Sequence, residues 1–203
     1  MQRTLSLLFI LLLMIPGVYL FAQEEEPDPI EPEWIDIVSS PYAEGDRNFV
    51  ITLGILFPTV FVGKEIENNN HGLSIGGTGS LAFNYFWTPN IFLGGEIGGS
   101  FSGTRARNML YIIPFGGRIG YHFLYQRFEF PVTLMVGGAV QRYLERGYFG
   151  FIIKPGASVF WRYNPEWSFG FNAAWWFIPQ WPTSGQDVYG NFLELTLSAR
   201  YHF

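Results

Sequence analysis

The last eleven residues of the chain alternate strictly between apolar and polar side chains. From Leu193 to Phe203, every odd position is apolar or aromatic and every even position is polar or charged. A period of two places these two sets on opposite faces of a β-strand. An exposed apolar strand edge invites aggregation in water, whereas a strand that closes a barrel in a bilayer is paired on both sides. The pattern therefore favours a strand that spans a membrane.

Similar patterns along the chain predict eight strands in total. The expected strands cover residues 48–63, 73–87, 91–103, 109–123, 128–143, 148–163, 167–178 and 191–203. All are long enough for a tilted strand to cross a bilayer, which takes about 9–11 residues. We therefore expect an all-β fold, an eight-stranded antiparallel up-and-down transmembrane β-barrel over residues 47–203.

The expected connections alternate between short and long. Short turns at residues 88–90, 124–127 and 164–166 alternate with longer connections, which cover residues 64–72, 104–108, 144–147 and 179–190. Transmembrane barrels have short periplasmic turns and longer outer loops. An even number of strands also places both ends of the barrel on one side. With a periplasmic N-terminus, every short turn is expected on the periplasmic side.

Aromatic residues gather at the strand ends next to the short turns. Such rings favour the boundary between lipid headgroups and hydrocarbon. The expected periplasmic girdle consists of Tyr85, Trp87, Tyr121, Trp161, Tyr163 and Trp167. The rival is a soluble eight-stranded barrel, such as a lipocalin-like carrier, which would turn its apolar face inward. The girdle, the terminal aromatic residue and the loop asymmetry favour the membrane barrel.

The N-terminal region predicts export. Residues 1–22 have a basic start, an apolar run and a small residue at Ala22, the pattern of a secretory signal peptide. Residues 23–46 contain nine acidic residues and no Lys or Arg, so the formal net charge of −5 arises there. This Pro-rich composition predicts a disordered periplasmic linker, with an acidic docking peptide as the alternative. The absence of cysteine excludes disulfides and thiol chemistry.

The segment Leu81–Glu96 resembles a recurrent hairpin of small bacterial outer-membrane β-barrels. It has an aromatic strand end, a tight Asn-containing turn and an apolar-Gly-Glu strand. The strand ends Tyr121-His122-Phe123 and Tyr201-His202-Phe203 resemble the same superfamily, which includes OmpA-, OmpX- and OmpW-like proteins. The resemblance covers about residues 47–203. It implies the bacterial outer membrane, with both termini periplasmic. It also implies insertion by the barrel-assembly machinery, with Tyr201 and Phe203 as the C-terminal assembly signal.

The inward face of the predicted barrel carries a network of charges. Extending the even-numbered set of the last strand through the other strands places seven charged residues in the lumen: Glu96, Arg118, Glu129, Lys154, Arg162, Glu194 and Arg200. Side chains just fill an eight-stranded barrel, and buried charges must pair. We therefore expect a salt-bridged core that closes the lumen. A polar lining for a narrow solute path is the alternative, and the pairing of the charges stays open.

These features predict a monomeric structural or surface-interaction protein with a largely filled polar lumen. The first alternative is a narrow porin-like, OmpW-like channel for small or hydrophobic solutes. The less favoured one is a lipid-modifying enzyme, for which His71 and Ser74 with Glu65 or Glu67 could imitate a catalytic group. We expect no catalytic, cofactor or metal site and no nucleic-acid partner. Trp181 and Tyr189 are candidate contacts for a surface ligand.

Overall fold

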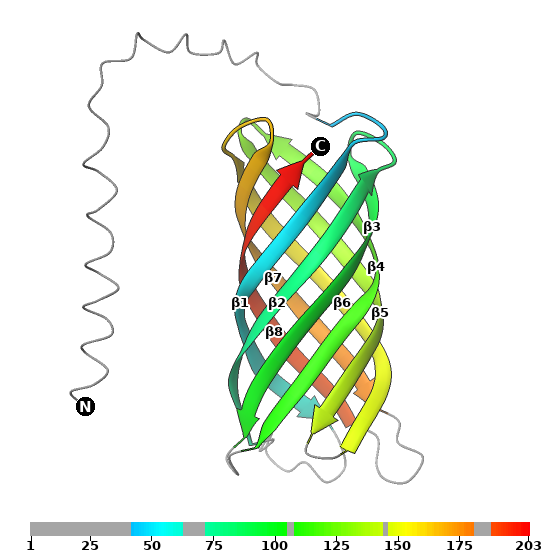
Figure 1. Ribbon diagram of the computed structural model, residues 1–203, viewed down its shortest axis with the longest axis vertical. Helices are drawn as coiled ribbons and strands as arrows, with labels where there is room; N and C mark the ends of the chain where they lie inside the picture. Colours follow the sequence, from blue (N-terminus) through cyan, green and yellow to red (C-terminus); the bar gives the residue numbers. More distant parts are fainter. Residues whose placement is uncertain (1–41, 63–71, 105–107, 144–145, 181–187) are drawn as a thin grey trace, which may run out of the picture. The chain divides into compact units, whose positions relative to one another are not determined.

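The computed structural model describes residues 42–62, 72–104, 108–143, 146–180 and 188–203, which form a closed antiparallel β-barrel (Figure 1). Each strand pairs with the next along the chain, and the last pairs with the first. The eight strands are β1 (Arg47–Val62), β2 (Leu73–Phe86), β3 (Ile91–Thr104), β4 (Met109–Tyr125), β5 (Phe128–Tyr143), β6 (Arg146–Arg162), β7 (Trp167–Gln180) and β8 (Val188–His202). The predicted fold class is confirmed.

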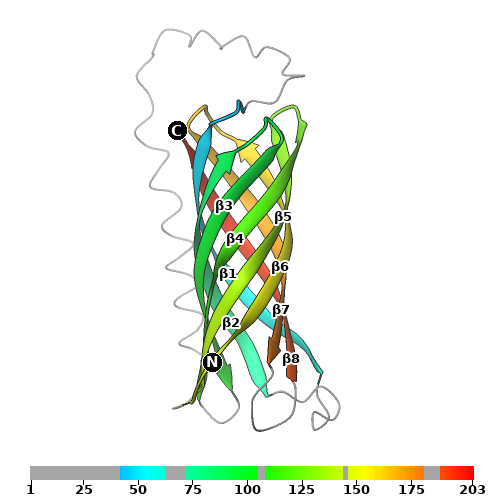
Figure 2. The same cartoon turned by 90° about the vertical axis from the view of Figure 1, so that its right-hand side faces the viewer.

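The strands are tilted against the barrel axis, as Figure 2 shows from the side. Side chains alternate between the lumen and the outer face along each strand. In β8, Leu197 is 70% exposed, whereas its neighbours Thr196 and Ser198 are 3% and 6% exposed. The outer face is therefore apolar and the polar and charged side chains of the strands face inward, the reverse of a soluble carrier. Among the described residues, no helix is long and apolar enough to cross a membrane.

The tight turns lie together at one end of the barrel, which we call the turn end (Figure 1). They are the turns between β2 and β3, β4 and β5, and β6 and β7. The turn between β4 and β5 contains only Gln126 and Arg127, and Gln126 adopts a φ of 55°. Asn48 pairs with His202, so the start of β1 and the end of β8 also lie there. The opposite end is the loop end, and residues 63–71, 105–107, 144–145 and 181–187 lie outside the described residues.

Residues 42–46, which were expected to belong to the linker, pack against the turn end. The backbone N–H of Gly45 donates to Phe86 O at 2.9 Å, and the N–H of Phe86 donates to Asp46 O at 2.9 Å. Tyr42 is only 4% exposed. The barrel therefore includes residues before β1. The expected signal peptide and the rest of the expected linker fall on residues 1–41, outside the described residues.

Three prolines coincide with gaps in the strand ladders. Between β5 and β6, Glu129 pairs with Phe160 and pairing resumes at Val132 with Ala157. Pro131 lies in this gap and has no N–H to donate. Comparable gaps lie beside Pro114 in the β3–β4 ladder and beside Pro155 in the β6–β7 ladder. Each ladder resumes in the same register, so these prolines weaken the wall locally without shifting the strands.

Candidate functional site

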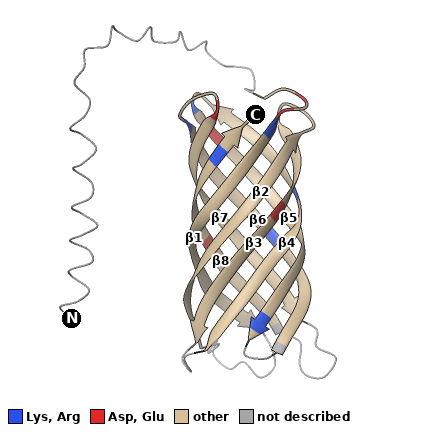
Figure 3. Cartoon of the chain, in the orientation of Figure 1, with Lys and Arg blue, Asp and Glu red and all other residues tan. Residues whose placement is uncertain are grey.

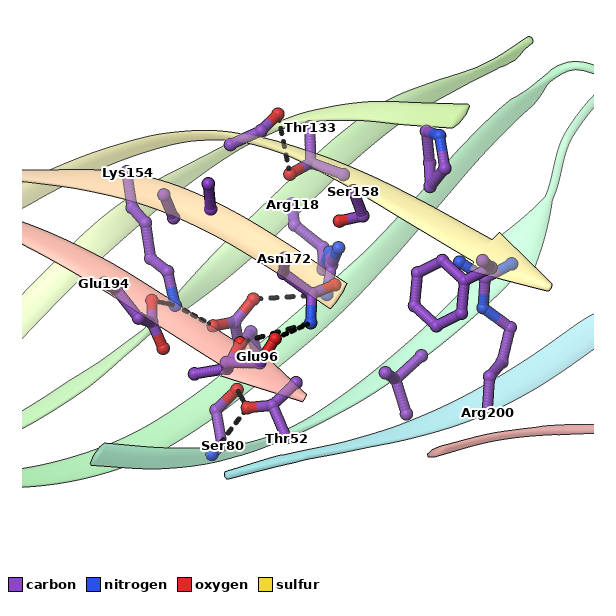
Figure 4. Close-up of a pocket in the computed structure, with 17 residues that line it drawn as sticks. Thr52, Ser80, Glu96, Arg118, Thr133, Lys154, Ser158, Asn172, Glu194 and Arg200 are labelled. Atoms are coloured by element: carbon purple, nitrogen blue, oxygen red, sulfur yellow. Dashed lines mark hydrogen bonds and ion pairs between the residues drawn. The ribbon is translucent and has the colours of Figure 1, made fainter. Parts of the chain in front are cut away.

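Four charged side chains meet at mid-height in the lumen and form what we call the central cluster: Glu96, Arg118, Lys154 and Glu194 (Figure 4). Lys154 Nζ lies 2.7 Å from Glu96 Oε1 and 2.6 Å from Glu194 Oε2. Arg118 Nη1 lies 3.2 Å from Glu96 Oε2. The two acids and two bases come from β3, β4, β6 and β8, and their charges balance. Lys154 is the link between the two carboxylates.

Trp176 supports the central cluster from the loop side. Its indole Nε1–H donates to Glu194 Oε2 at 2.7 Å. Lys154 Nζ lies 5.1 Å from the centre of the Trp176 ring, within the range of a cation–π contact. Trp176 is 1% exposed. The buried ion pairs are therefore completed by a hydrogen bond and an aromatic face, which buried charges need to be stable.

A second group of ionisable side chains lies nearer the turn end. This turn-side cluster consists of Tyr42, Glu129, Arg162 and Arg200. Arg200 Nη1 lies 2.6 Å from Glu129 Oε2, and Arg162 Nε lies 3.4 Å from Glu129 Oε1. Arg200 also lies over the Phe160 ring, with its guanidinium carbon 3.6 Å from the ring centre. One carboxylate thus faces two guanidinium groups from β6 and β8.

Tyr42 closes the turn end of this cluster. Its phenol donates to Glu129 Oε2 at 2.8 Å and accepts a hydrogen bond from Arg200 Nη1 at 3.2 Å. Its ring stacks on Phe86, with centroids 4.0 Å apart and planes 9° apart. Burial raises the pKa of the Tyr42 phenol, so the hydroxyl stays protonated and keeps donating at ordinary pH.

An apolar layer fills the lumen on the loop side of the central cluster. It consists of Leu56, Ile112, Met135, Ala139, Ile152, Trp176, Ile178 and Phe192, and each of these is no more than 2% exposed. The polar lining expected from the sequence therefore does not extend along the whole lumen. Runs such as residues 110–114 and 175–178 break the alternation because their inward positions are apolar as well.

A small cavity of about 40 Å³ remains in the lumen beside the central cluster (Figure 4). Hydroxyl and amide side chains line part of it, including Thr52, Ser80 and Asn172. A water molecule needs roughly 10–15 Å³ of such volume. The cavity therefore has room for about three water molecules and is too small for a larger solute.

The residues expected in the aromatic girdle face outward near the turn end. Tyr85, Trp87, Tyr121, Trp161, Tyr163 and Trp167 are all exposed. Tyr201 and Phe203 are also exposed, and the Tyr201 ring lies 5.0 Å from that of Trp167. These positions suit rings at a membrane boundary. The roles of the girdle and of the C-terminal signal stay predictions.

The remaining candidates are scattered. Tyr189 stacks on Phe177, with ring centroids 6.0 Å apart, whereas Trp181 lies outside the described residues. Of the residues that could imitate a catalytic group, Glu65, Glu67 and His71 also lie outside. The Ser74 hydroxyl donates to the backbone oxygen of Gly103 at 2.9 Å. Within the described ranges, no group of three or more acidic or histidine side chains could hold a metal ion.

The sequence is similar to known proteins. One protein-family model matches residues 24–201. An uncharacterized protein of Treponema pallidum (strain Nichols) is 29% identical over 135 residues, which cover 66% of this chain and 62% of that protein. The match thus spans less than two thirds of the length of this relative.

Solved structures with the same fold include Neisserial surface protein A and the outer membrane protein OprG. Neisserial surface protein A has a TM-score of 0.54 at 13% identity, covering 80% of this chain and 99% of that chain. OprG of Pseudomonas aeruginosa has a TM-score of 0.51 at 9% identity, covering 79% and 98%. At such identities the likeness shows the fold alone.

Proposed function

Because the chain belongs to the protein family matched over residues 24–201 and has the fold of small outer-membrane β-barrels, we propose a closed-lumen outer-membrane protein with a structural or surface-interaction role. The apolar layer is the observation that carries this proposal. An ion that crossed it would have to leave water without polar partners, which is very costly.

The two charged clusters support the same proposal. Their side chains are held to one another by ion pairs from different strands, and the space between them takes only a few water molecules. A solute path would have to separate these pairs and also part the apolar layer. We therefore propose that the side chains in the lumen stabilise the barrel and leave no path for a solute.

The proposed placement is in the bacterial outer membrane, as a monomer, with the turn end in the periplasm. Short periplasmic turns are the rule in such barrels, and the start of β1 and the end of β8 lie at the same end as the turns. Figure 3 shows how few Lys, Arg, Asp and Glu residues lie along the strands, as suits a wall in contact with lipid. Insertion is proposed to involve the barrel-assembly machinery, with Tyr201 and Phe203 as its signal.

Conductance of the refolded protein in planar bilayers tests the closed lumen. The wild type is expected to show no steady conductance. Trp176→Ala combined with Phe192→Ala removes two large members of the apolar layer and also the support that Trp176 gives to Glu194 and Lys154, so it is expected to produce conducting events. Each large-to-small change in a core costs about 3–5 kcal/mol, so folding of the variant is checked first by its gel mobility without heating.

Trp175→Ala is the matched control for this experiment. Trp175 neighbours Trp176 on β7 but faces outward and is 39% exposed. Its removal is expected to leave the lumen closed. Steady conductance of the wild type would overturn the proposal and support a narrow channel for small or hydrophobic solutes. If the double variant does not conduct, the charged clusters are sufficient to close the lumen without the apolar layer.

A further inference from the structure

The outer face of the barrel has an apolar groove where β5, β6 and β7 run side by side. Its volume is about 310 Å³, at the lower end of the range of about 300–1,000 Å³ typical of ligand pockets. Ala157 and Ala173 form its floor, and Phe130, Val132 and Phe171 form its walls.

The groove exists because small side chains meet across the strands. Ala157 on β6 pairs directly with Ala173 on β7, so two methyl groups face outward side by side. On the neighbouring strands, Ala157 also pairs with Val132 of β5, and Ala173 also pairs with Leu195 of β8, so these four residues form one row across the wall. The gap beside Pro131 in the β5–β6 ladder lies at the edge of this row. Larger neighbours thus surround a floor that no side chain of the wall fills.

The inner face of the wall is also small at this level. Gly156 pairs with Ala174, and both line the cavity in the lumen. That cavity and the outer groove share Pro131, Ser158 and Ala173 as lining residues. These three residues therefore lie between the cavity and the groove. Because the floor of the groove faces outward, a group that fills it must come from the outer side of the barrel.

The groove is continuous with the exposed apolar face of the barrel, which is the surface that meets lipid in the proposed membrane placement, on which this inference rests. Phe130, Val132 and Phe171 belong to this face, with exposures of 37%, 51% and 48%. A single hydrocarbon chain can enter a hollow two alanines wide. The curved wall of a second barrel would instead rest on the protruding rings. An empty apolar hollow loses the contacts that its lining would otherwise make.

We propose that this groove binds one acyl chain of a membrane phospholipid. The chain lies over Ala157 and Ala173, between the rings of Phe130 and Phe171. The bound acyl chain fills the hollow that the small side chains of Ala157 and Ala173 leave on the outer face of the barrel. This site is separate from the lumen and does not depend on whether the lumen conducts.

Photolabelling in vesicles tests the site. The probe is phosphatidylethanolamine with a diazirine in one acyl chain, in vesicles of phosphatidylethanolamine and phosphatidylglycerol. Label on the wild type is expected to concentrate on the strand segments around Ala157 and Ala173. Ala157→Phe fills the groove and should reduce this label about tenfold, which corresponds to about 1.4 kcal/mol, or roughly two buried methylene groups.

Ala199→Phe is the matched control, because Ala199 faces outward on β8 between Ile51 and Phe169. It should leave the label at the groove unchanged. If Ala157→Phe does not insert, Ala157→Val fills the groove partly and should reduce the label by a smaller factor. Even labelling around the barrel, or equal labelling of Ala157→Phe and the wild type, would overturn the proposal.

A single-cysteine variant separates lipid from a second copy of the chain. Ala157→Cys introduces the one cysteine of the protein, since the native sequence has none. Oxidation in the same vesicles is expected to give no covalent dimer. Efficient dimer formation would show that the groove meets a second barrel instead of a lipid chain.

Discussion

At the scale of single residues, the lumen is organised around side chains that satisfy several partners at once. Lys154 bridges two carboxylates, and Glu129 receives Tyr42 and Arg200 on the same oxygen. Truncating one partner of a buried ion pair leaves the other charge uncompensated. The residues with the most partners should therefore be the most sensitive to substitution.

Lys154→Gln is expected to destabilise the barrel more than Arg118→Gln. Lys154 contacts both Glu96 and Glu194, and breaking a buried pair costs about 3–5 kcal/mol. Arg118 makes one ion pair, at 3.2 Å, and its side chain is 13% exposed, so the loss of this pair should cost about 1.5–3 kcal/mol, the range for a hydrogen bond to a charged group. Urea unfolding in lipid vesicles measures both. Equal stabilities of the two variants would contradict the bridging role of Lys154.

Tyr42→Phe should lower the free energy of unfolding by about 1–3 kcal/mol, because Glu129 loses a buried donor. The ring stacked on Phe86 is retained. Tyr42→Ala removes the ring as well and should cost more. The same urea titration measures both changes. If both variants unfold like the wild type, residues 42–46 do not hold the turn end.

The stabilisation by the Tyr42 hydroxyl should fade in alkali. Burial raises the pKa of Tyr42 in the folded state above the unfolded value of about 10. The contribution is therefore complete below a pH of about 10 and is lost as the pH rises further. Stability curves of the wild type and of Tyr42→Phe should converge above this pH. A constant difference between them up to the most alkaline pH would argue against a buried phenol.

At the scale of the strands, the period of two and the turn residues predicted eight strands and the inward charged positions, but not the apolar layer of the lumen. The pattern is clear because lipid and lumen demand different side chains on alternate residues. The ends of β7 and β8 were missed: Pro179 and Gly190 suggest a loop, yet Pro179 pairs with Tyr189 inside the sheet. The burial of Tyr42 at the turn end was not predicted, because the residues before β1 show no alternation of apolar and polar side chains. The ion pairs could not be predicted, since Glu129 and Arg200 are 71 residues apart and their meeting depends on every register between them.

The end of β8 yields a prediction about insertion. Phe203→Ala should slow assembly into the membrane and leave more protein in the periplasm, because the terminal aromatic is the expected recognition element. Phe123→Ala is the matched control, since Phe123 faces outward at the same end and is 54% exposed against 57% for Phe203. Pulse-chase fractionation of cells measures both rates. If both substitutions slow assembly equally, the effect comes from the loss of any exposed aromatic ring and not from a signal at the C-terminus.

At the scale of the whole molecule, the barrel has two unlike ends. One carries tight turns, aromatic rings and the packed residues 42–46, and the other carries the connections outside the described residues. Between them, the apolar layer fills the loop side of the lumen, the charged clusters lie further toward the turn end, and Phe86 and Phe92 are buried at the turn end itself. The orientation of this asymmetry in the membrane is open to a direct test.

Single cysteines placed at the two ends should report the orientation. In intact cells, a membrane-impermeant thiol reagent should label Ser184→Cys and leave Gln126→Cys unlabelled. The reason is that position 126 lies in a tight turn, and such turns face the periplasm in outer-membrane barrels. Labelling after the outer membrane is opened controls for reactivity. Labelling of position 126 but not 184 in intact cells would reverse the proposed topology.

The turn-side cluster also has a consequence for the order of assembly. Glu129 on β5 meets Tyr42 and Arg200 of β8, so we expect these two contacts to form only when the last strand joins the first. Until then, Glu129 has only Arg162 of the neighbouring strand β6 as a partner, and Arg200 lacks its carboxylate. The free-energy cost of these unpaired charges is removed when β8 pairs with β1. We therefore expect the cluster to make an incomplete barrel less stable and a completed barrel hard to reopen.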